Sequence, residues 1–192
     1  MAKLFASEMA ERVCSDIEGK TLGEVLRERG LFDLGEAAAV GAAMCDALAA
    51  IHRAGLVHQD VKAQNVMREH DGRLVLMDLG AGASEAGRPQ WGTPCYMGPE
   101  LFSGGGASAR SDMYSLGVLL FFLTTGAFPI DGRTYKEIAE QHGRGEGRRL
   151  REIRPDFPDS FLDAIDRVMA RDPACRFSTA DELSAAIRVE GS

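Results

Sequence analysis

The fold is decided by the stretch His58-Gln59-Asp60-Val61-Lys62-Ala63-Gln64-Asn65, which Asp78-Leu79-Gly80 follows. Between these segments lie two short apolar runs rich in strand formers, Val66-Met67 and Leu74-Val75-Leu76. The pair Asp71-Gly72 separates the runs and is a strong signal for a two-residue hairpin turn. This pattern predicts a β-hairpin directly after a segment rich in charged and amide side chains.

The predicted hairpin brings Asn65 next to Asp78. With Asp71-Gly72 as the turn, these two residues face each other across the strands, and directly opposed residues have Cβ atoms about 4.5–5.5 Å apart. Two oxygen ligands placed in this way suit a hard cation such as Mg²⁺ that also contacts substrate phosphates. Asp60 lies within reach as a base, and Lys62 can meet phosphate charge.

These residues resemble the catalytic loop of eukaryotic-type protein kinases, whose pattern H-R-D-x-x-x-x-N precedes a D-F-G metal loop. His58, Asp60 and Asn65 match the pattern in identity and spacing, and Lys62 is similar to the serine/threonine branch of the family. Gln59 stands where the family has an arginine that receives an activation-loop phosphate. This departure from the family pattern implies that activation does not require phosphorylation of the activation loop.

Further segments resemble kinase motifs in the expected order, which is stronger support than a lone H-x-D. They are the hinge exit (18–22), the segment ending in A-P-E (92–100), the start of the central buried helix (111–117) and a late arginine-containing segment (171–177). In the family this late arginine pairs with the A-P-E glutamate. We therefore expect a buried ion pair between Glu100 and Arg176.

The resemblance implies a mainly α fold, namely the large C-terminal lobe of a protein kinase with a small β-hairpin and without the small N-terminal lobe. The small lobe carries a glycine-rich loop and a strand lysine, and no G-x-G-x-x-G precedes Gly19. Residues 1–16 then form an atypical N-terminal segment, and residues 17–189 form a partial kinase domain. Either the chain is a truncated product of a longer kinase, which we favour, or it is a large-lobe-only protein.

The resemblance also assigns roles at the reacting centre. Asp60 is the catalytic aspartate that orients the substrate hydroxyl and accepts its proton, and Lys62 neutralises charge on the transferring phosphoryl group. Asn65 and Asp78 hold Mg²⁺, which implies ATP and Mg²⁺ as cofactors.

Five more residues take supporting roles. Met67 and Met77 either form the floor of the adenine site or are plain core methionines. His58 supports the loop rather than acting as a base. Thr93 contacts the catalytic loop, and Asp112 bonds its backbone amides.

Composition excludes several other classes of protein. The chain has 192 residues, 45% of them hydrophobic, which is enough for one globular core, and a net charge of −7 without a basic stripe argues against nucleic-acid binding. Five arginines between Arg144 and Arg154 are read as part of a solvated loop. Four scattered cysteines without C-x-x-C spacing fit a reducing cytosol, so we expect a cytoplasmic protein with neither a zinc site nor a disulfide framework.

The sequence predicts a membrane-free chain composed mostly of helices. The uncharged run from Met113 to Ile130 reaches the lower edge of transmembrane length, but Gly117 and Pro129 favour a buried helix over about 112–125. A short helix is expected over 21–29, and a longer one follows that Asp33 caps and Gly55 ends. Later helices are expected over 135–142, 159–170 and 179–189.

Together these observations predict the large lobe of a serine/threonine protein kinase, which transfers the ATP γ-phosphate to serine or threonine hydroxyls of a protein substrate. The alternative is a non-catalytic, pseudokinase-like binding module, which the missing small lobe motivates. A small-molecule phosphotransferase shares the H-x-D…N pattern but lacks the segment at 92–100 and the helix start at Asp112, so we rank it below both.

Overall fold

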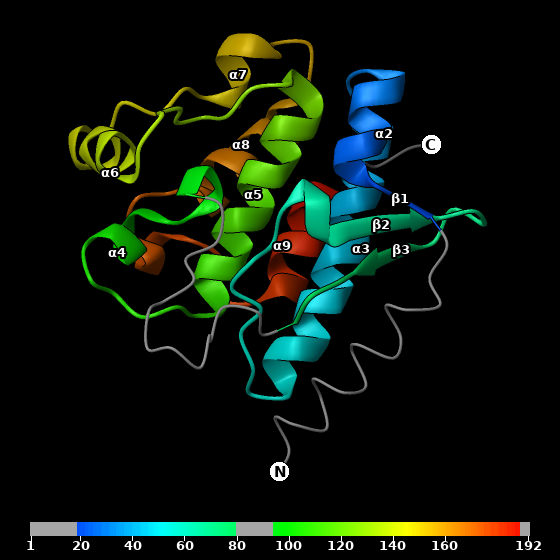
Figure 1. Ribbon diagram of the computed structural model, residues 1–192, viewed down its shortest axis with the longest axis horizontal. Helices are drawn as coiled ribbons and strands as arrows, with labels where there is room; N and C mark the ends of the chain where they lie inside the picture. The colour runs from blue at the N-terminus through cyan, green and yellow to red at the C-terminus, as the bar shows by residue number, and fades with distance from the viewer. Residues whose placement is uncertain (1–18, 80–93, 189–192) are drawn as a thin grey trace.

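The computed structural model describes residues 19–79 and 94–188, in which helices predominate and a small sheet lies to one side (Figure 1). The helices are α2 (Leu22–Arg29), α3 (Leu34–Arg53), α4 (Pro99–Phe102), α5 (Ala109–Thr125), α6 (Tyr135–Arg144), α7 (Leu150–Ile153), α8 (Asp159–Val168) and α9 (Ala180–Ile187). The strands are β1 (Gly19–Thr21), β2 (Val66–Glu69) and β3 (Leu74–Leu76), and three 3-10 turns cover Ala63–Asn65, Pro94–Tyr96 and Pro173–Cys175.

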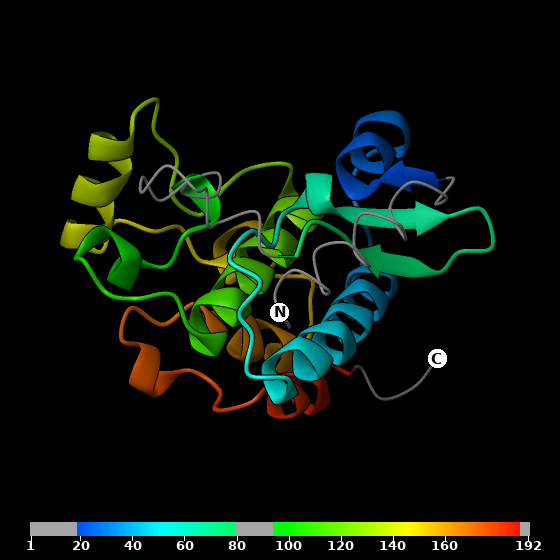
Figure 2. The same ribbon diagram turned by 60° about the horizontal axis from the view of Figure 1, so that its bottom comes forward.

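Helix α5 is the central element of the fold. It runs between the side that carries the sheet and α3 and the side that carries α4 and α6 (Figures 1 and 2). Met113, Leu116 and Leu120 on this helix are fully buried, and α3 and α8 pack against it. The prediction of a buried helix here is confirmed, but α5 begins at Ala109 because Ser108 caps it, its hydroxyl accepting the Ser111 N–H at 3.3 Å.

Helix α3 follows its predicted pattern. Asp33 caps it, with Oδ1 accepting the Glu36 N–H at 2.8 Å, and Gly55 follows its end with a φ of +73°. By length and composition α3 could also cross a membrane. Its fully buried stripe, which includes Val40 and Met44, packs against α5 and α9, so a core helix accounts for its apolar character.

The sheet corrects the predicted hairpin in two respects. It has three antiparallel strands in the order β1-β2-β3, so the strand at Gly19–Thr21 was missed. The register pairs Val66 with Leu76 and Met67 with Val75, one residue away from the predicted pairing. The cause is a three-residue loop between Glu69 and Arg73, in which Gly72 has a φ of +89°. A three-residue hairpin with a left-handed glycine is the common alternative to the two-residue turn.

The remaining helices form where expected with shifted ends. Helix α6 continues to Arg144, α8 stops at Val168, and α9 begins after its Thr179 cap and ends at Ile187. The short helices α4 and α7 were not predicted. Helix α7 lies inside the arginine-rich segment, where Arg151 forms an ion pair with Asp163 at 2.6 Å, so that segment is more than a solvated loop.

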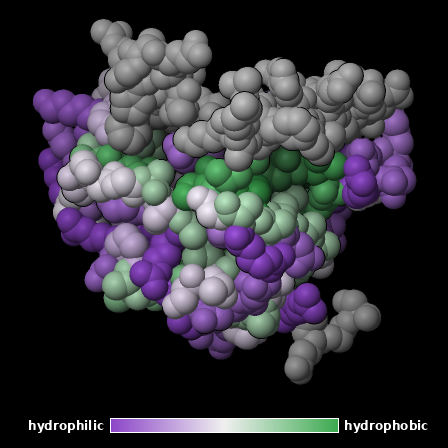
Figure 3. Space-filling view, turned by 90° about the horizontal axis from the view of Figure 1, so that it is seen from below, coloured by the Kyte–Doolittle hydropathy of each residue, from purple (hydrophilic) through white to green (hydrophobic). Residues whose placement is uncertain are grey.

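One face of the molecule carries apolar side chains that are not part of the closed core. Seen from below, they form a band with polar side chains at its two ends and below it (Figure 3). In the described ranges the exposed large apolar residues are Leu31, Tyr135 and Ile153. Most of the band therefore comes from half-buried side chains, which are common on folded proteins.

Candidate active site

The loop that follows α3 is anchored by one buried carboxylate on α5. Asp112, only 1% exposed, accepts the N–H groups of His58 and Gln59, one on each carboxylate oxygen, both at 2.8 Å. Gln59 has a φ of +72°, a left-handed conformation that is uncommon for residues other than glycine. The expected contact between Asp112 and the loop backbone is confirmed, and it holds this unfavourable conformation in place.

His52 completes the anchor and was not predicted. Its Nε2 lies 2.8 Å from Asp112 Oδ2, and since a carboxylate only accepts, the imidazole donates. His52 is in the last turn of α3, sixty residues before its partner, so no local pattern in the sequence could have indicated the contact.

His58 connects the loop to the end of the hairpin. The ring is fully buried, Nε2 donates to the Met77 carbonyl at 2.9 Å, and Nδ1 accepts the Asp60 N–H at 3.3 Å. Burial lowers the pKa of His58, and the opposing charge of Asp112 does not restore it. A neutral histidine with both ring nitrogens engaged fits a supporting role.

Asp60 lies at the centre of a polar cluster. Its Oδ2 accepts from Lys62 Nζ at 2.7 Å and from Asn65 Nδ2 at 2.8 Å, and Asn65 Nδ2 also donates to the Asp60 carbonyl at 2.9 Å. The Asp60 and Lys62 side chains are 15% and 20% exposed. The structure thus brings together three of the residues expected at the reacting centre, close to the surface.

Asn65 and Asp78 are not cross-strand partners as predicted. The Asn65 carbonyl accepts the N–H of Met77 at 2.8 Å, which puts Asp78 one residue beyond the pairing. Asp78 is exposed and has a φ of +61°, so the chain turns sharply there. The assignment of Asn65 and Asp78 to a metal site is therefore supported by the resemblance to kinases and not by cross-strand pairing.

The donor set can still be compared with what a cation needs. Asn65 directs Nδ2 to Asp60, and no partner of its Oδ1 or of the Asp78 carboxylate lies in the described part of the chain. No group of three His, Cys, Asp or Glu side chains among those residues could hold a metal. Two oxygen ligands fit Mg²⁺, which keeps several waters and takes further ligands from phosphates.

Met67 and Met77 are both half-buried, and neither belongs to the main core cluster. Met67 lies on β2 between Thr21 and Val75 in the sheet. Their partial exposure is compatible with a place beside a ligand. Thr93, expected to contact the loop, lies outside the described residues.

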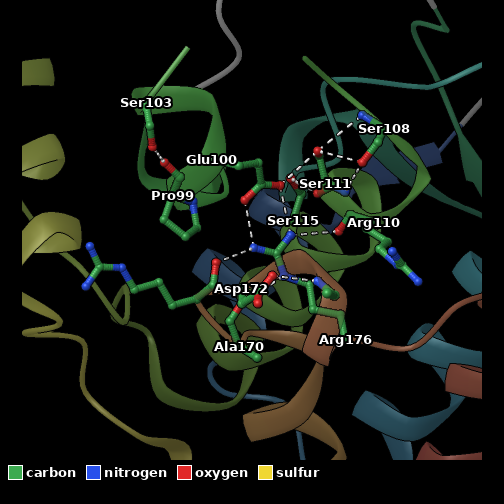
Figure 4. Close-up of polar contacts among 12 residues, drawn as sticks. Pro99, Glu100, Ser103, Ser108, Arg110, Ser111, Ser115, Ala170, Asp172 and Arg176 are labelled. Atoms are coloured by element: carbon green, nitrogen blue, oxygen red, sulfur yellow. Dashed lines mark hydrogen bonds and ion pairs between the residues drawn. The ribbon is translucent and has the colours of Figure 1, made fainter. Parts of the chain in front are cut away.

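The predicted ion pair between Glu100 and Arg176 is present (Figure 4). Arg176 Nη1 and Nη2 bind the two Glu100 oxygens at 2.8 and 2.7 Å, and the Arg176 side chain is 0% exposed. Arg176 also donates to the carbonyls of Ala170 at 2.8 Å and Arg110 at 3.0 Å. The pair therefore joins α4 to the start of α5 and to the segment after α8.

The charge on Glu100 is stabilised locally. Burial raises the pKa of this carboxyl, but the hydrogen bonds and charge of Arg176 outweigh burial and hold the pKa below its usual 4.5. Ser111 adds a hydrogen bond from Oγ to Glu100 Oε1 at 2.9 Å, a contact that the sequence did not indicate. Glu100 is therefore ionised at neutral pH.

The central helix, the anchored loop and the ion pair define the fold and site of a protein kinase. The sequence matches the protein kinase domain family over residues 8–186, so the chain belongs to this family.

Relatives of the chain include several bacterial serine/threonine-protein kinases. PknL of Mycobacterium tuberculosis is 37% identical over 175 residues, which cover 88% of this chain and 44% of PknL. PrkC of Bacillus subtilis is 32% identical over 178 residues, covering 90% of this chain and 28% of PrkC. The probable kinase CPE1738 of Clostridium perfringens is 31% identical over 173 residues, covering 87% and 25%. The chain thus spans less than half the length of each of these relatives.

Proposed function

We propose that this chain is the catalytic large lobe of a serine/threonine protein kinase that transfers the ATP γ-phosphoryl group to a serine or threonine hydroxyl of a protein. The observation that carries the proposal is the cluster of Asp60, Lys62 and Asn65 on a loop anchored by Asp112. The names of the bacterial relatives support the same activity. Phosphoryl transfer depends almost wholly on positioning and charge stabilisation, which an anchored loop provides.

In this proposal each member of the cluster has a distinct task. Asp60 accepts a hydrogen bond from the substrate hydroxyl, orients its oxygen towards the phosphoryl group and takes up its proton. Lys62 leaves its 2.7 Å contact with Asp60 Oδ2 to meet the charge of the transferring group. Asn65 holds the Asp60 carboxylate in position through Nδ2.

Mg²⁺ and ATP are part of the proposal. Asn65 Oδ1 and the Asp78 carboxylate would hold the cation, and Met67 and Met77 would contact the adenine ring. The cation, when bound, neutralises charge on the phosphates. The metal site does not need a third protein ligand, because phosphate oxygens and water complete the shell.

We also propose that the described residues correspond to the large lobe alone and act together with a small lobe on a longer, cytoplasmic polypeptide. The described part contains one three-stranded sheet and no glycine-rich strand hairpin. The coding DNA upstream of Met1 tests this directly. An in-frame glycine-rich loop followed by a V-A-x-K strand is expected, and a stop codon directly before Met1 would contradict it.

The transfer activity is tested with radiolabelled ATP, Mg²⁺ and a generic protein substrate, using the kinase that carries this lobe. Asp78→Asn is expected to lower the rate strongly and to raise the Mg²⁺ concentration needed for half-maximal activity. Asp71→Asn, on the exposed hairpin loop, is the matched control and should leave both unchanged. Equal Mg²⁺ requirements in the Asp78 and Asp71 variants would remove Asp78 from the metal site.

The second candidate function is a non-catalytic binding module that presents this lobe to protein partners. The observation that favours it is the single small sheet. Among the described residues no separate small lobe covers the cluster of Asp60, Lys62 and Asn65. Calorimetry of the chain alone with Mg·ATP separates the two functions. Micromolar binding that Asp78→Asn abolishes would argue against a pure binding module, whereas no heat of binding to the chain or to its parent would favour it.

A further inference from the structure

A pocket lies on the opposite side of α5 from the candidate active site. It has a volume of about 300 Å³ and is formed by α4, α5, α6, the segment after α6 and the end of α8. Its lining includes Tyr114, Ile130, His142, Arg148, Met169 and Arg171, and we call this cavity the basic pocket. Its volume is at the lower end of the range of about 300–1,000 Å³ found for small-molecule sites.

The basic pocket concentrates positive charge on an acidic protein. Arg148, Arg149 and Arg171 line it, and none of their guanidinium groups has a carboxylate within 4.0 Å among residues 19–79 and 94–188. The one acidic residue in the wall, Asp166, is already paired with Arg151, at 3.1 Å. Because the whole chain has a net charge of −7, three uncompensated arginines around one cavity favour an anionic occupant.

The walls between the arginines are apolar. Ile130 and Tyr114 are 6% and 4% exposed, and Met169 packs against the core. Arg148 is held in place from both ends of the residue, since its N–H donates to the Pro129 carbonyl at 2.9 Å and its Nη2 donates to the Phe128 carbonyl. The cavity thus combines a hydrophobic surface with a cationic rim in which Arg148 is already oriented.

His142 gives an independent indication that this wall is adapted to a ligand. The residue is 6% exposed, and its Nε2 has no hydrogen-bond partner in the described part of the chain. Burial lowers the pKa of His142 to about 4, so the ring is neutral at physiological pH. Buried polar atoms are nearly always satisfied, and an exception in a cavity wall calls for a partner that is not part of the protein chain.

We propose that the basic pocket binds a small amphipathic anion, with its charged head group against Arg148 and Arg171 and its apolar body against Ile130 and Met169. No role in phosphoryl transfer is required of this site, so the inference is independent of the proposed function. The ligand class is an organic carboxylate or phosphate with a short apolar chain.

The position of the pocket gives binding a structural consequence. Arg171, on its rim, accepts a hydrogen bond from Arg176 through its carbonyl at 3.4 Å, and the Arg176 guanidinium lies 4.7 Å from the centre of the Tyr114 ring. The buried ion pair with Glu100 therefore shares a wall with the pocket. An occupant of the basic pocket would therefore contact the same wall that holds the segment around Glu100.

The probe for this site is 1-anilinonaphthalene-8-sulfonate, which combines an aromatic body with one sulfonate and becomes fluorescent in apolar surroundings. It is titrated into the full chain, and octanoate, octyl phosphate and neutral octan-1-ol are then added as competitors. We expect displacement by both anions and not by the alcohol. The more potent of octanoate and octyl phosphate identifies the head group.

Two variants place the probe in the basic pocket. Gly147→Leu fills it, because a Cβ at Gly147 would face Ile130 at an ordinary contact distance of 3.5 Å. Its control is Gly143→Leu on the exposed side of α6, where nothing lies within 4 Å. Arg171→Gln removes one rim charge, with exposed Arg133→Gln as its control. We expect Arg171→Gln to weaken the octanoate-displaceable binding about tenfold, as for the loss of one charged hydrogen bond, and Gly147→Leu to weaken it at least as much by occupying the space.

The outcomes are decisive in both directions. Loss of displaceable binding in the two pocket variants, with both controls equal to wild type, supports the site. Probe binding that is equal in all five proteins, or that octan-1-ol displaces as well as octanoate does, would overturn it. Unfolding curves of Gly147→Leu and Gly143→Leu establish that both variants are folded, and a folded Gly147→Leu protein with wild-type binding counts against the proposal.

Discussion

Replacing Arg176 by methionine should destabilise the fold more than any surface change. The substitution keeps an unbranched apolar stem but removes both hydrogen bonds to Glu100 and those to the carbonyls of Ala170 and Arg110. It leaves the Glu100 carboxylate, 14% exposed, without its counter-charge.

The expected size follows from burial. Removing one partner of a buried ion pair costs about 3–5 kcal/mol, since the remaining charge stays desolvated. We expect about 4 kcal/mol for Arg176→Met because the arginine is fully buried and its bonds to Glu100 are short and bidentate. Against a typical total stability of about 5–15 kcal/mol, this loss is severe.

The double variant Glu100→Leu/Arg176→Met isolates the ion pair from the other contacts. Both this variant and Arg176→Met lose the bonds to backbone carbonyls, so the difference between them reports mainly on the stranded carboxylate. Replacing both partners of a buried ion pair by apolar residues often leaves the free energy of unfolding unchanged. We therefore expect the double variant to be about 2 kcal/mol more stable than Arg176→Met alone.

The pair also makes stability depend on pH. The pKa of Glu100 is lower in the folded protein than its usual 4.5, so its contribution is fully present above about pH 4.5. The contribution is lost as the pH falls through the lowered pKa. Glu100→Gln should therefore be less stable than wild type at neutral pH, and the difference should shrink in acid.

Urea unfolding followed by far-UV circular dichroism measures all four proteins at neutral pH and in acid. Equal midpoints for wild type and Arg176→Met would refute the proposed importance of the pair. A double variant less stable than Arg176→Met would refute the stranded-charge explanation.

Three further predictions concern local structure. Asp112→Asn should raise amide hydrogen exchange at Gln59, because a neutral amide cannot accept both loop N–H groups as a carboxylate does; unchanged protection would contradict the anchoring role. Gly72→Ala should destabilise the chain by about 1 kcal/mol in urea unfolding because of the φ of +89°, and a neutral effect would disprove the left-handed loop. Asp33→Ala should cost about 1 kcal/mol in the same assay through loss of the bond to the Glu36 N–H, whereas Asp33→Asn should retain most of it; equal losses would contradict a capping role.

Local signals in the sequence predicted most of the helices. The Asp33 cap, the glycine at position 55 and the apolar stripe through Met44 each act within a few residues, so the sequence contains all the information needed to place α3. The same applies to the central helix, whose uncharged run can only be buried. Its start was expected near residue 112, but the helix begins at Ala109 because the Ser108 hydroxyl caps it by accepting the Ser111 N–H.

The errors in the predicted sheet arose where the pairing of a strand depended on residues distant in the sequence. The turn at Asp71-Gly72 is compatible with loops of two or three residues, and the pairing of β2 with Gly19–Thr21 on its other edge is not visible from the hairpin alone. A slip of one residue moved Asp78 away from Asn65 in the ladder. The resemblance to kinases was insensitive to this error because it used spacing along the chain.

The sequence predicted which residues form the candidate site, but not all of the residues that hold them in place. The cluster of Asp60, Lys62 and Asn65 is local, because Asp60 and Asn65 lie only five residues apart in the sequence. Their anchor is not local, since His52 and Asp112 lie on two different helices. Contacts of this kind come from helix packing and need a structure.

In the proposed function the Asp60 carboxylate orients the substrate hydroxyl and accepts its proton during phosphoryl transfer. The most direct measurement is the rate of γ-phosphoryl transfer from labelled ATP by the kinase that carries this lobe, comparing wild type with Asp60→Asn and with Asp46→Asn at an exposed position on α3. We predict a fall of about 10²–10⁴-fold for Asp60→Asn and none for Asp46→Asn. Equal rates for all three proteins would contradict the assignment.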